Sequence, residues 1–145
     1  MKKSALFLCI VLIIASFMQC KKYPDGPAIS FRSKAERVAN TWKVSKYMED
    51  NVDKTSDFNT YLNSYVLTTT KSGDYTISYK ILGTLNYNES GTWKFSNNKK
   101  DITFTRTSPN AGSTYTWQIL KLYEKEFWGR SVDSSGKVTE VHLTP

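Results

Sequence analysis

The sequence predicts an all-β domain: an eight-stranded antiparallel up-and-down barrel preceded by a short helix. Three observations predict it. Strand-sized segments carry apolar residues at every second position, turns rich in glycine, asparagine and aspartate separate the later segments, and no long segment has helical periodicity. Short turns make strands that are neighbours in the sequence neighbours in the sheet. A meander with one apolar face closes most economically into a barrel, because closure leaves no unpaired strand edge.

The elements can be placed in order along the chain. Ser33 and Glu36 have the spacing of a capping box, in which each side chain satisfies a backbone donor at a helix start, so a short helix is expected over residues 34–39. The clearest strand is 75–81, where four apolar residues alternate with three polar ones. An apolar phase shift within 119–122 predicts a bulge or bend. The other expected strands are 42–47, 63–70, 92–95, 102–105, 115–119, 126–132 and 137–144.

The first 20 residues have the order of a secretory signal that ends at a lipidation site. Lys2 and Lys3 precede 13 mostly apolar residues, 5–17, and the segment ends at Cys20. A membrane-spanning helix needs about 20 apolar residues, so this run is too short for one. The small-x-small site of an ordinary secretory signal is also missing. We therefore expect a signal peptide over 1–19, a lipidated tether over 20–32 and the barrel domain over 33–145.

Cys20 is the expected site of lipid attachment. Cys9 lies in the signal, so the mature chain has no second cysteine for a disulfide, and its stability must come from a packed core. The segment Phe-Met-Gln-Cys at 17–20 resembles the lipoprotein motifs of Bacteroidota. This resemblance implies cleavage before Cys20 and attachment to a membrane through the N-terminal lipid. With Lys21 next, it also implies the outer membrane, on its periplasmic or its surface face.

The charge balance argues against nucleic acid as a partner. The chain has 20 Lys and Arg against 13 Asp and Glu. This surplus of basic residues becomes smaller when Lys2 and Lys3 are lost with the signal. The remaining basic residues are scattered through the sequence and form no recognisable nucleic-acid-binding motif. A solvated surface whose net positive charge aids solubility explains the surplus of basic residues more simply.

The sequence around the first predicted strand resembles that of lipocalins. Segment 40–44, Asn-Thr-Trp-Lys-Val, follows a short helix as the Gly-x-Trp motif does in that family. The resemblance covers about residues 33–144 and is greatest to lipocalin-like lipoproteins of Bacteroidota. In lipocalins the tryptophan closes one barrel end and an arginine from a late strand packs across it. The resemblance therefore implies a structural role for Trp42, with Arg130 as its partner and Arg106 as the alternative.

The aromatic strand faces are the main indication of function. An eight-stranded barrel is just wide enough either to be filled by side chains or to hold one small ligand. The sequence thus leaves two functions open: binding of a small hydrophobic ligand, or an envelope scaffold or protein-interaction role with a filled barrel. The loop 49–59 is either a lid over the barrel mouth or a plain connection. The candidate ligand-binding residues are Tyr75, Tyr79, Trp93, Phe104, Tyr115 and Trp117.

Residues for catalysis or metal binding are few. His142 is the single histidine, and although Glu140 shares its strand face, no nucleophile lies beside it. One histidine without an available thiol cannot form the usual zinc ligand set, and the acidic loop 49–59 lacks the glycine and glutamate of a hand-type calcium loop. We expect no enzyme activity, no catalytic residues, no metal and no cofactor.

Overall fold

The computed structural model describes residues 31–145. The predicted signal peptide, the lipidation site at Cys20 and most of the predicted tether lie outside the described residues. Within 31–145, none of the helices has the length and apolar character needed to cross a membrane.

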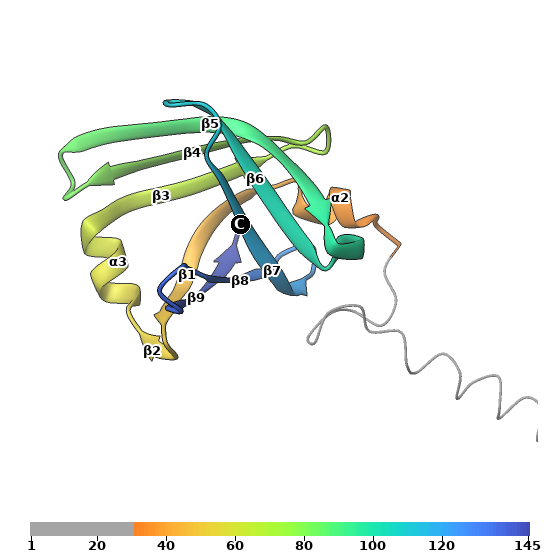
Figure 1. The fold of residues 1–145 in the computed structure, drawn as a ribbon. Coiled ribbons are helices and arrows are strands. Elements are labelled where there is room, and N and C mark those ends of the chain that lie inside the picture. The colour runs from red at the N-terminus through yellow and green to blue at the C-terminus, as the bar shows by residue number, and fades with distance from the viewer. Residues whose placement is uncertain (1–30) are drawn as a thin grey trace, which may run out of the picture.

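The described chain forms a closed antiparallel barrel (Figure 1). Each strand from β3 to β9 pairs with its sequence neighbour, and β1 pairs with both β3 and β9, which closes the sheet. Eight strands make the barrel, while β2 is a two-residue strand paired to the end of β1. The predicted fold class is confirmed. The strands are β1 (Thr41–Glu49), β2 (Val52–Asp53), β3 (Leu62–Thr69), β4 (Asp74–Ile81), β5 (Leu85–Ser96), β6 (Asp101–Ser108), β7 (Thr114–Leu122), β8 (Phe127–Val132) and β9 (Val138–Thr144).

The bounds of the predicted strands agree with the structure to within three residues except at β5, and β2 lies in the segment predicted as a loop. This strand begins at Leu85, well before the predicted 92–95, and pairs without interruption along β4 from Ile81 opposite Leu85 to Asp74 opposite Thr92. Its first half is rich in asparagine, glutamate and serine, which resembles a loop composition. The predicted irregularity after Ile119 is present as a register shift in the pairing of β7 with β8.

In the described part of the chain, two α-helices and one short 3-10 turn, η2 (Asn97–Lys99), accompany the barrel. The first helix, α2 (Lys34–Val38), has the predicted capping box: the Glu36 amide donates to Ser33 Oγ at 3.2 Å, and the Ser33 amide donates to Glu36 Oε2 at 2.8 Å. The second, α3 (Thr55–Tyr61), begins inside the segment 49–59 that was predicted as a loop and ends two residues beyond it. It was missed because its sequence has no side-chain cap and few strong helix formers.

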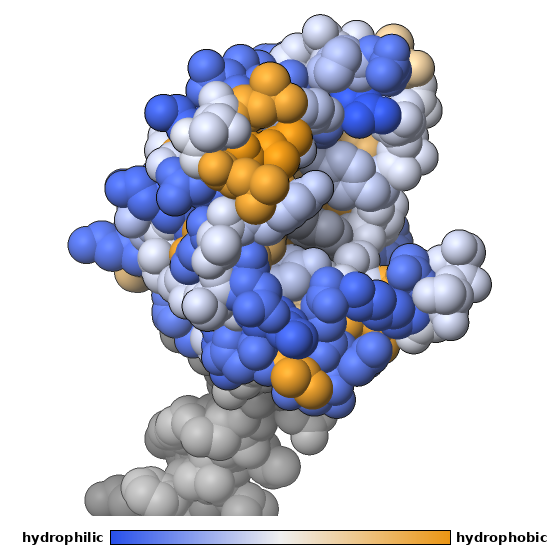
Figure 2. All heavy atoms as spheres, turned by 90° about the vertical axis from the view of Figure 1, so that its left-hand side faces the viewer, coloured by the Kyte–Doolittle hydropathy of each residue, from blue (hydrophilic) through white to orange (hydrophobic). Residues whose placement is uncertain are grey.

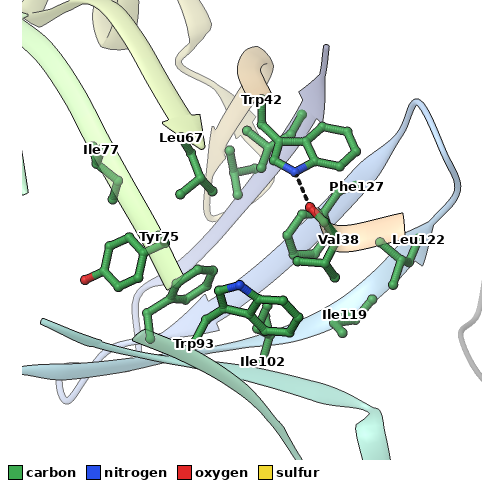
Figure 3. Close-up of a cluster of buried hydrophobic side chains, with 13 residues drawn as sticks. Val38, Trp42, Leu67, Tyr75, Ile77, Trp93, Ile102, Ile119, Leu122 and Phe127 are labelled. Carbon is green, nitrogen blue, oxygen red and sulfur yellow. Dashed lines mark hydrogen bonds between the residues drawn. The ribbon is translucent and has the colours of Figure 1, made fainter. Parts of the chain in front are cut away.

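The core lies in the half of the barrel next to α2 (Figure 3). Trp42 is fully buried there, and its indole Nε1 donates a hydrogen bond of 2.8 Å to the carbonyl oxygen of Val38 in α2. The Phe127 ring packs edge-on against the indole at 5.9 Å between ring centroids. The helix and the tryptophan together close this end of the barrel.

The expected partner of Trp42 needs a correction. Phe127 and Gly129 of β8 face the interior, so Arg130 points outward by strand alternation and is exposed on the barrel surface. The basic side chain at the closed end is instead Arg37 of α2, which is buried and donates from Nη1 to the carbonyl oxygen of Leu122 at 2.6 Å. Arg106, the alternative, faces the interior near the other end, beside Glu89.

Candidate functional site

The closed half of the barrel is packed with side chains. Tyr75, Trp93 and Phe104, three of the candidate ligand-binding residues, belong to this buried core. The rings of Tyr75 and Phe104 meet edge-to-face at 5.2 Å, and the indole Nε1 of Trp93 donates to the carbonyl oxygen of Thr70 at 3.0 Å. In this half the apolar strand faces build the core.

A small apolar cavity remains in the opposite half of the barrel, beneath α3. Its volume is about 70 Å³. Trp117 is the one candidate ligand-binding residue in its wall, where Gly129 leaves the space for the indole: a Cβ at that glycine would lie 2.8 Å from Trp117 Cε3. The wall consists of Val44, Tyr47, Phe58, Tyr65, Trp117, Gly129, Ser131, Thr139 and Val141.

Helix α3 covers this cavity through a single aromatic side chain. The ring of Phe58 stacks on Tyr47 at 4.6 Å and meets Tyr65 edge-on at 5.6 Å. Figure 1 shows α3 at the side of the barrel away from α2. The segment 49–59 thus includes most of a helix that covers an interior cavity, which is the geometry of a lid.

The barrel wall is incompletely paired beside α3. Strands β1 and β3 pair only at Thr41–Lys43 opposite Val66–Thr68, and β1 then diverges toward β2 and β9. A groove of about 340 Å³ lies at this gap, lined by residues of β1, α3 and β3. Val44 and Tyr65 border both the groove and the cavity, so these two side chains separate the interior from the outside.

A carboxylate lies inside the barrel beside the core residue Tyr75. The Glu89 side chain is 9% exposed. Its Oε1 accepts hydrogen bonds from the hydroxyls of Tyr75 at 2.7 Å and Tyr115 at 3.5 Å, and its Oε2 accepts from the Tyr87 hydroxyl at 3.1 Å and from Arg106 Nη1 at 3.5 Å. These five residues, Glu89, Tyr75, Tyr87, Tyr115 and Arg106, are called the Glu89 cluster below.

Tyr65 and Tyr79 link the cavity to the Glu89 cluster. The ring of Tyr79 stacks on Tyr65 at 5.9 Å and on Tyr87 at 4.7 Å. Burial raises the pKa of both phenols above its ordinary value, and the nearby Glu89 charge raises each further. Both hydroxyls therefore stay protonated at neutral pH.

Burial acts in the same way on the tyrosines within the cluster. It raises the pKa of Tyr75 and of Tyr115, and the Glu89 charge adds to the effect. Tyr75 and Tyr115 accordingly present neutral phenols to the Glu89 carboxylate.

Sequence reasoning missed the Glu89 cluster because β5 was predicted too short. Within β5, Tyr87, Glu89 and Gly91 share one face with Trp93, so an earlier strand start would have placed the carboxylate in the interior. Gly91 makes this packing feasible, since a Cβ there would lie 2.6 Å from Tyr75 Cε1. For Phe58 of α3, no comparable sequence pattern indicates that its side chain faces the interior.

His142 lies on the outer face of the barrel, away from the cavity. Its ring stacks on Trp128 at 3.9 Å, and its Nε2 lies 2.7 Å from Glu140 Oε1. Lys121, from β7, has its Nζ 4.2 Å from the centre of the Trp128 ring.

Among residues 31–145, no group of three or more histidine, cysteine, aspartate or glutamate side chains is placed to hold a metal ion.

The hairpin between β4 and β5 carries exposed apolar side chains. Leu82 and Leu85 are 62% and 64% exposed at its tip. The space-filling view of this side of the molecule shows an apolar patch among polar residues (Figure 2). Tyr61, at the end of α3, is also exposed, and its carbonyl oxygen accepts a hydrogen bond from the Leu82 amide at 2.9 Å.

Solved structures share this fold. No protein-family model and no curated protein matches the chain. An uncharacterized protein from Bacteroides eggerthii is similar with a TM-score of 0.53 and 12% identity, over 74% of this chain and 98% of that chain. A lipocalin-like protein from Bacteroides uniformis gives 0.50 and 12%, over 74% of this chain and 97% of that one. The fold is therefore a lipocalin-like barrel.

Proposed function

We propose that this protein binds a small hydrophobic ligand inside the barrel, beneath α3. The observation that carries the proposal is the apolar cavity walled by Val44, Phe58 and Trp117 in a barrel whose other half is filled. The lipocalin-like fold supports it, because barrels of this size can hold one small ligand.

Ligand entry requires movement of α3. The cavity of about 70 Å³ is well below the roughly 300–1,000 Å³ of ordinary small-molecule sites. Movement of α3 opens the cavity toward the groove between β1 and β3, because the helix supplies Phe58 to the cavity wall and Asn59 to the groove. Helix α3 suits such movement, since it has no buried residue and no side-chain cap.

A change in the cavity wall tests this site. Ser131→Leu places an apolar side chain in the cavity, whereas Val132→Leu alters the exposed neighbour on the outer face. Native mass spectrometry of protein gently extracted from its own membrane should detect a bound molecule in the wild type and in Val132→Leu. Ser131→Leu should lose it. A wild-type barrel that is empty and binds no fatty-acid probe would contradict ligand binding and favour the scaffold role.

The second part of the proposal concerns location. We infer from the sequence that the mature chain begins at Cys20, carries lipid there and is held in the outer membrane, on its periplasmic or surface face. Cys20→Ala should abolish incorporation of labelled fatty acid, with Cys9→Ala as the matched control. Labelling that persists in Cys20→Ala would refute this attachment site.

A further inference from the structure

The charges of the Glu89 cluster are already balanced within the protein. A carboxylate offers about four acceptor positions. Glu89 uses them for three tyrosine hydroxyls and Arg106. Arg106 is held further by the carbonyl oxygen of Asn110, 3.3 Å from Nε, and by Ser113 Oγ, 2.6 Å from Nη2. Neither charge requires a counter-ion from a ligand.

The donors left for a ligand are neutral. Among residues 31–145, neither the Tyr65 nor the Tyr79 hydroxyl makes a hydrogen bond, although both rings are half-buried and stacked together. The Tyr65 ring forms part of the cavity wall beside Phe58 and Trp117. A ligand in the cavity therefore has Tyr65 as its nearest uncommitted phenol, with Tyr79 behind it.

We infer that the ligand is an apolar molecule with one uncharged oxygen-bearing group, such as an alcohol or an ester, and that the Tyr65 hydroxyl donates a hydrogen bond to that oxygen. This inference rests on the proposed ligand-binding function and names the class of ligand. The apolar part occupies the space beneath α3, and the polar group points toward Tyr65 and Tyr79.

Charged head groups fit this site poorly. An ionised carboxylate would be brought close to the buried Glu89, whose charge repels it, while Arg106 is already engaged. An ammonium group would need an acceptor, and the oxygens of Glu89 already accept four hydrogen bonds. Either ion would also lose its hydration on entry without a new partner.

Three ligands of equal chain length compare a neutral, an anionic and a cationic head group. They are dodecanol, dodecanoate and dodecylamine. Each is tested for displacement of the neutral dye N-phenyl-1-naphthylamine from the full-length protein in phosphatidylcholine nanodiscs, with empty nanodiscs as the blank. Dodecanol should displace the dye at a concentration about tenfold lower than either ion, the difference that about 1.4 kcal/mol produces. Dodecanoate or dodecylamine binding as tightly as dodecanol would overturn the inference and leave ligand binding intact. Absence of any dye or ligand binding would instead contradict the proposed function.

Tyr65→Phe tests the named donor. Loss of one hydrogen bond should weaken dodecanol binding about fivefold to tenfold, while binding of the dye, which makes no such bond, stays unchanged. Tyr61→Phe is the matched control, because that tyrosine is exposed at the end of α3. Equal dodecanol affinity in wild type and Tyr65→Phe, with the dye bound normally in both, would show that the Tyr65 hydroxyl does not donate to the ligand.

Discussion

The Arg37 guanidinium donates a hydrogen bond of 2.6 Å to the carbonyl oxygen of Leu122 and thereby ties α2 to the end of β7. Both residues are buried, and they lie 85 positions apart in the chain. Arg37 Nε is also buried but has no hydrogen-bond partner within residues 31–145. The contact thus combines one strong hydrogen bond and good packing with one uncompensated polar group.

Two substitutions of Arg37 should separate these contributions. Arg37→Ala removes the hydrogen bond and leaves a void under α2, so we expect the free energy of unfolding to fall by about 3 kcal/mol. Arg37→Met keeps the packing and also removes the unpartnered Nε, so its cost should be about 1 kcal/mol or less. Urea unfolding measures both. Equal losses would mean that the hydrogen bond, and not the packing, dominates.

Leu82 should be replaceable with a gain in stability. Its φ is 48° and that of Gly83 is 73°, and the Thr84 amide donates to the carbonyl oxygen of Ile81 at 3.1 Å, so both central positions of this turn have the positive φ of a type I′ turn. Leucine is strained in this region, whereas asparagine tolerates it and Asn-Gly is a preferred pair for this turn. Leu82→Asn should therefore raise the free energy of unfolding by about 1 kcal/mol.

Leu85→Asn is the matched control for this turn. Leu85 is equally exposed but belongs to β5, where asparagine is disfavoured in a strand. The urea midpoint should rise for Leu82→Asn and stay the same or fall for Leu85→Asn. An equal rise for both would trace the gain to lost apolar surface instead of turn geometry.

The fold could be predicted because most strands are half-buried, so that alternation marks them directly. In β4, Tyr75, Ile77 and Tyr79 face inward and Thr76 and Ser78 face outward, as the pattern indicates. The helix α3 escaped prediction because its position depends on one ring contact, that of Phe58 with Tyr47 and Tyr65, and not on a periodic apolar face.

The candidate site was harder to predict than the fold. Alternation shows that Trp93 and Trp117 point inward but not how deep each lies along the barrel, because depth depends on register. Register places Trp93 opposite Phe104 in the filled half and Gly129 against Trp117 at the cavity. Glu89 reaches the interior only because β5 starts early, and Arg130 faces outward because of the alternation in β8.

The buried tyrosines should limit stability in alkali. Burial raises the pKa of Tyr65, Tyr75 and Tyr115 in the folded protein above the unfolded value. The neutral phenols thus favour folding fully below about pH 10, and this contribution is lost as the pH rises above that value toward the folded-state pKa. Tyrosinate absorbance and circular dichroism, followed together, should show these phenols ionising as the barrel unfolds. Their ionisation in a barrel that keeps its circular dichroism would contradict this prediction.

Removal of the Phe58 ring should open the cavity. Its contacts with Tyr47 and Tyr65 are the aromatic contacts of α3 with the barrel, so Phe58→Ala both enlarges the space beneath the helix and weakens its closure. We expect a neutral apolar dye to bind several-fold faster and to dissociate faster, because entry no longer requires the ring to move. Stopped-flow fluorescence measures both rates.

Tyr61→Ala supplies the comparison for Phe58→Ala within the same helix. Tyr61 is exposed and does not line the cavity, but its truncation costs α3 a similar amount of side-chain surface. Unchanged dye kinetics in Tyr61→Ala together with faster kinetics in Phe58→Ala would identify Phe58 as the group that closes the site. If both variants bind the dye at the wild-type rate, entry does not pass beneath α3, and the lid role fails while ligand binding itself stands.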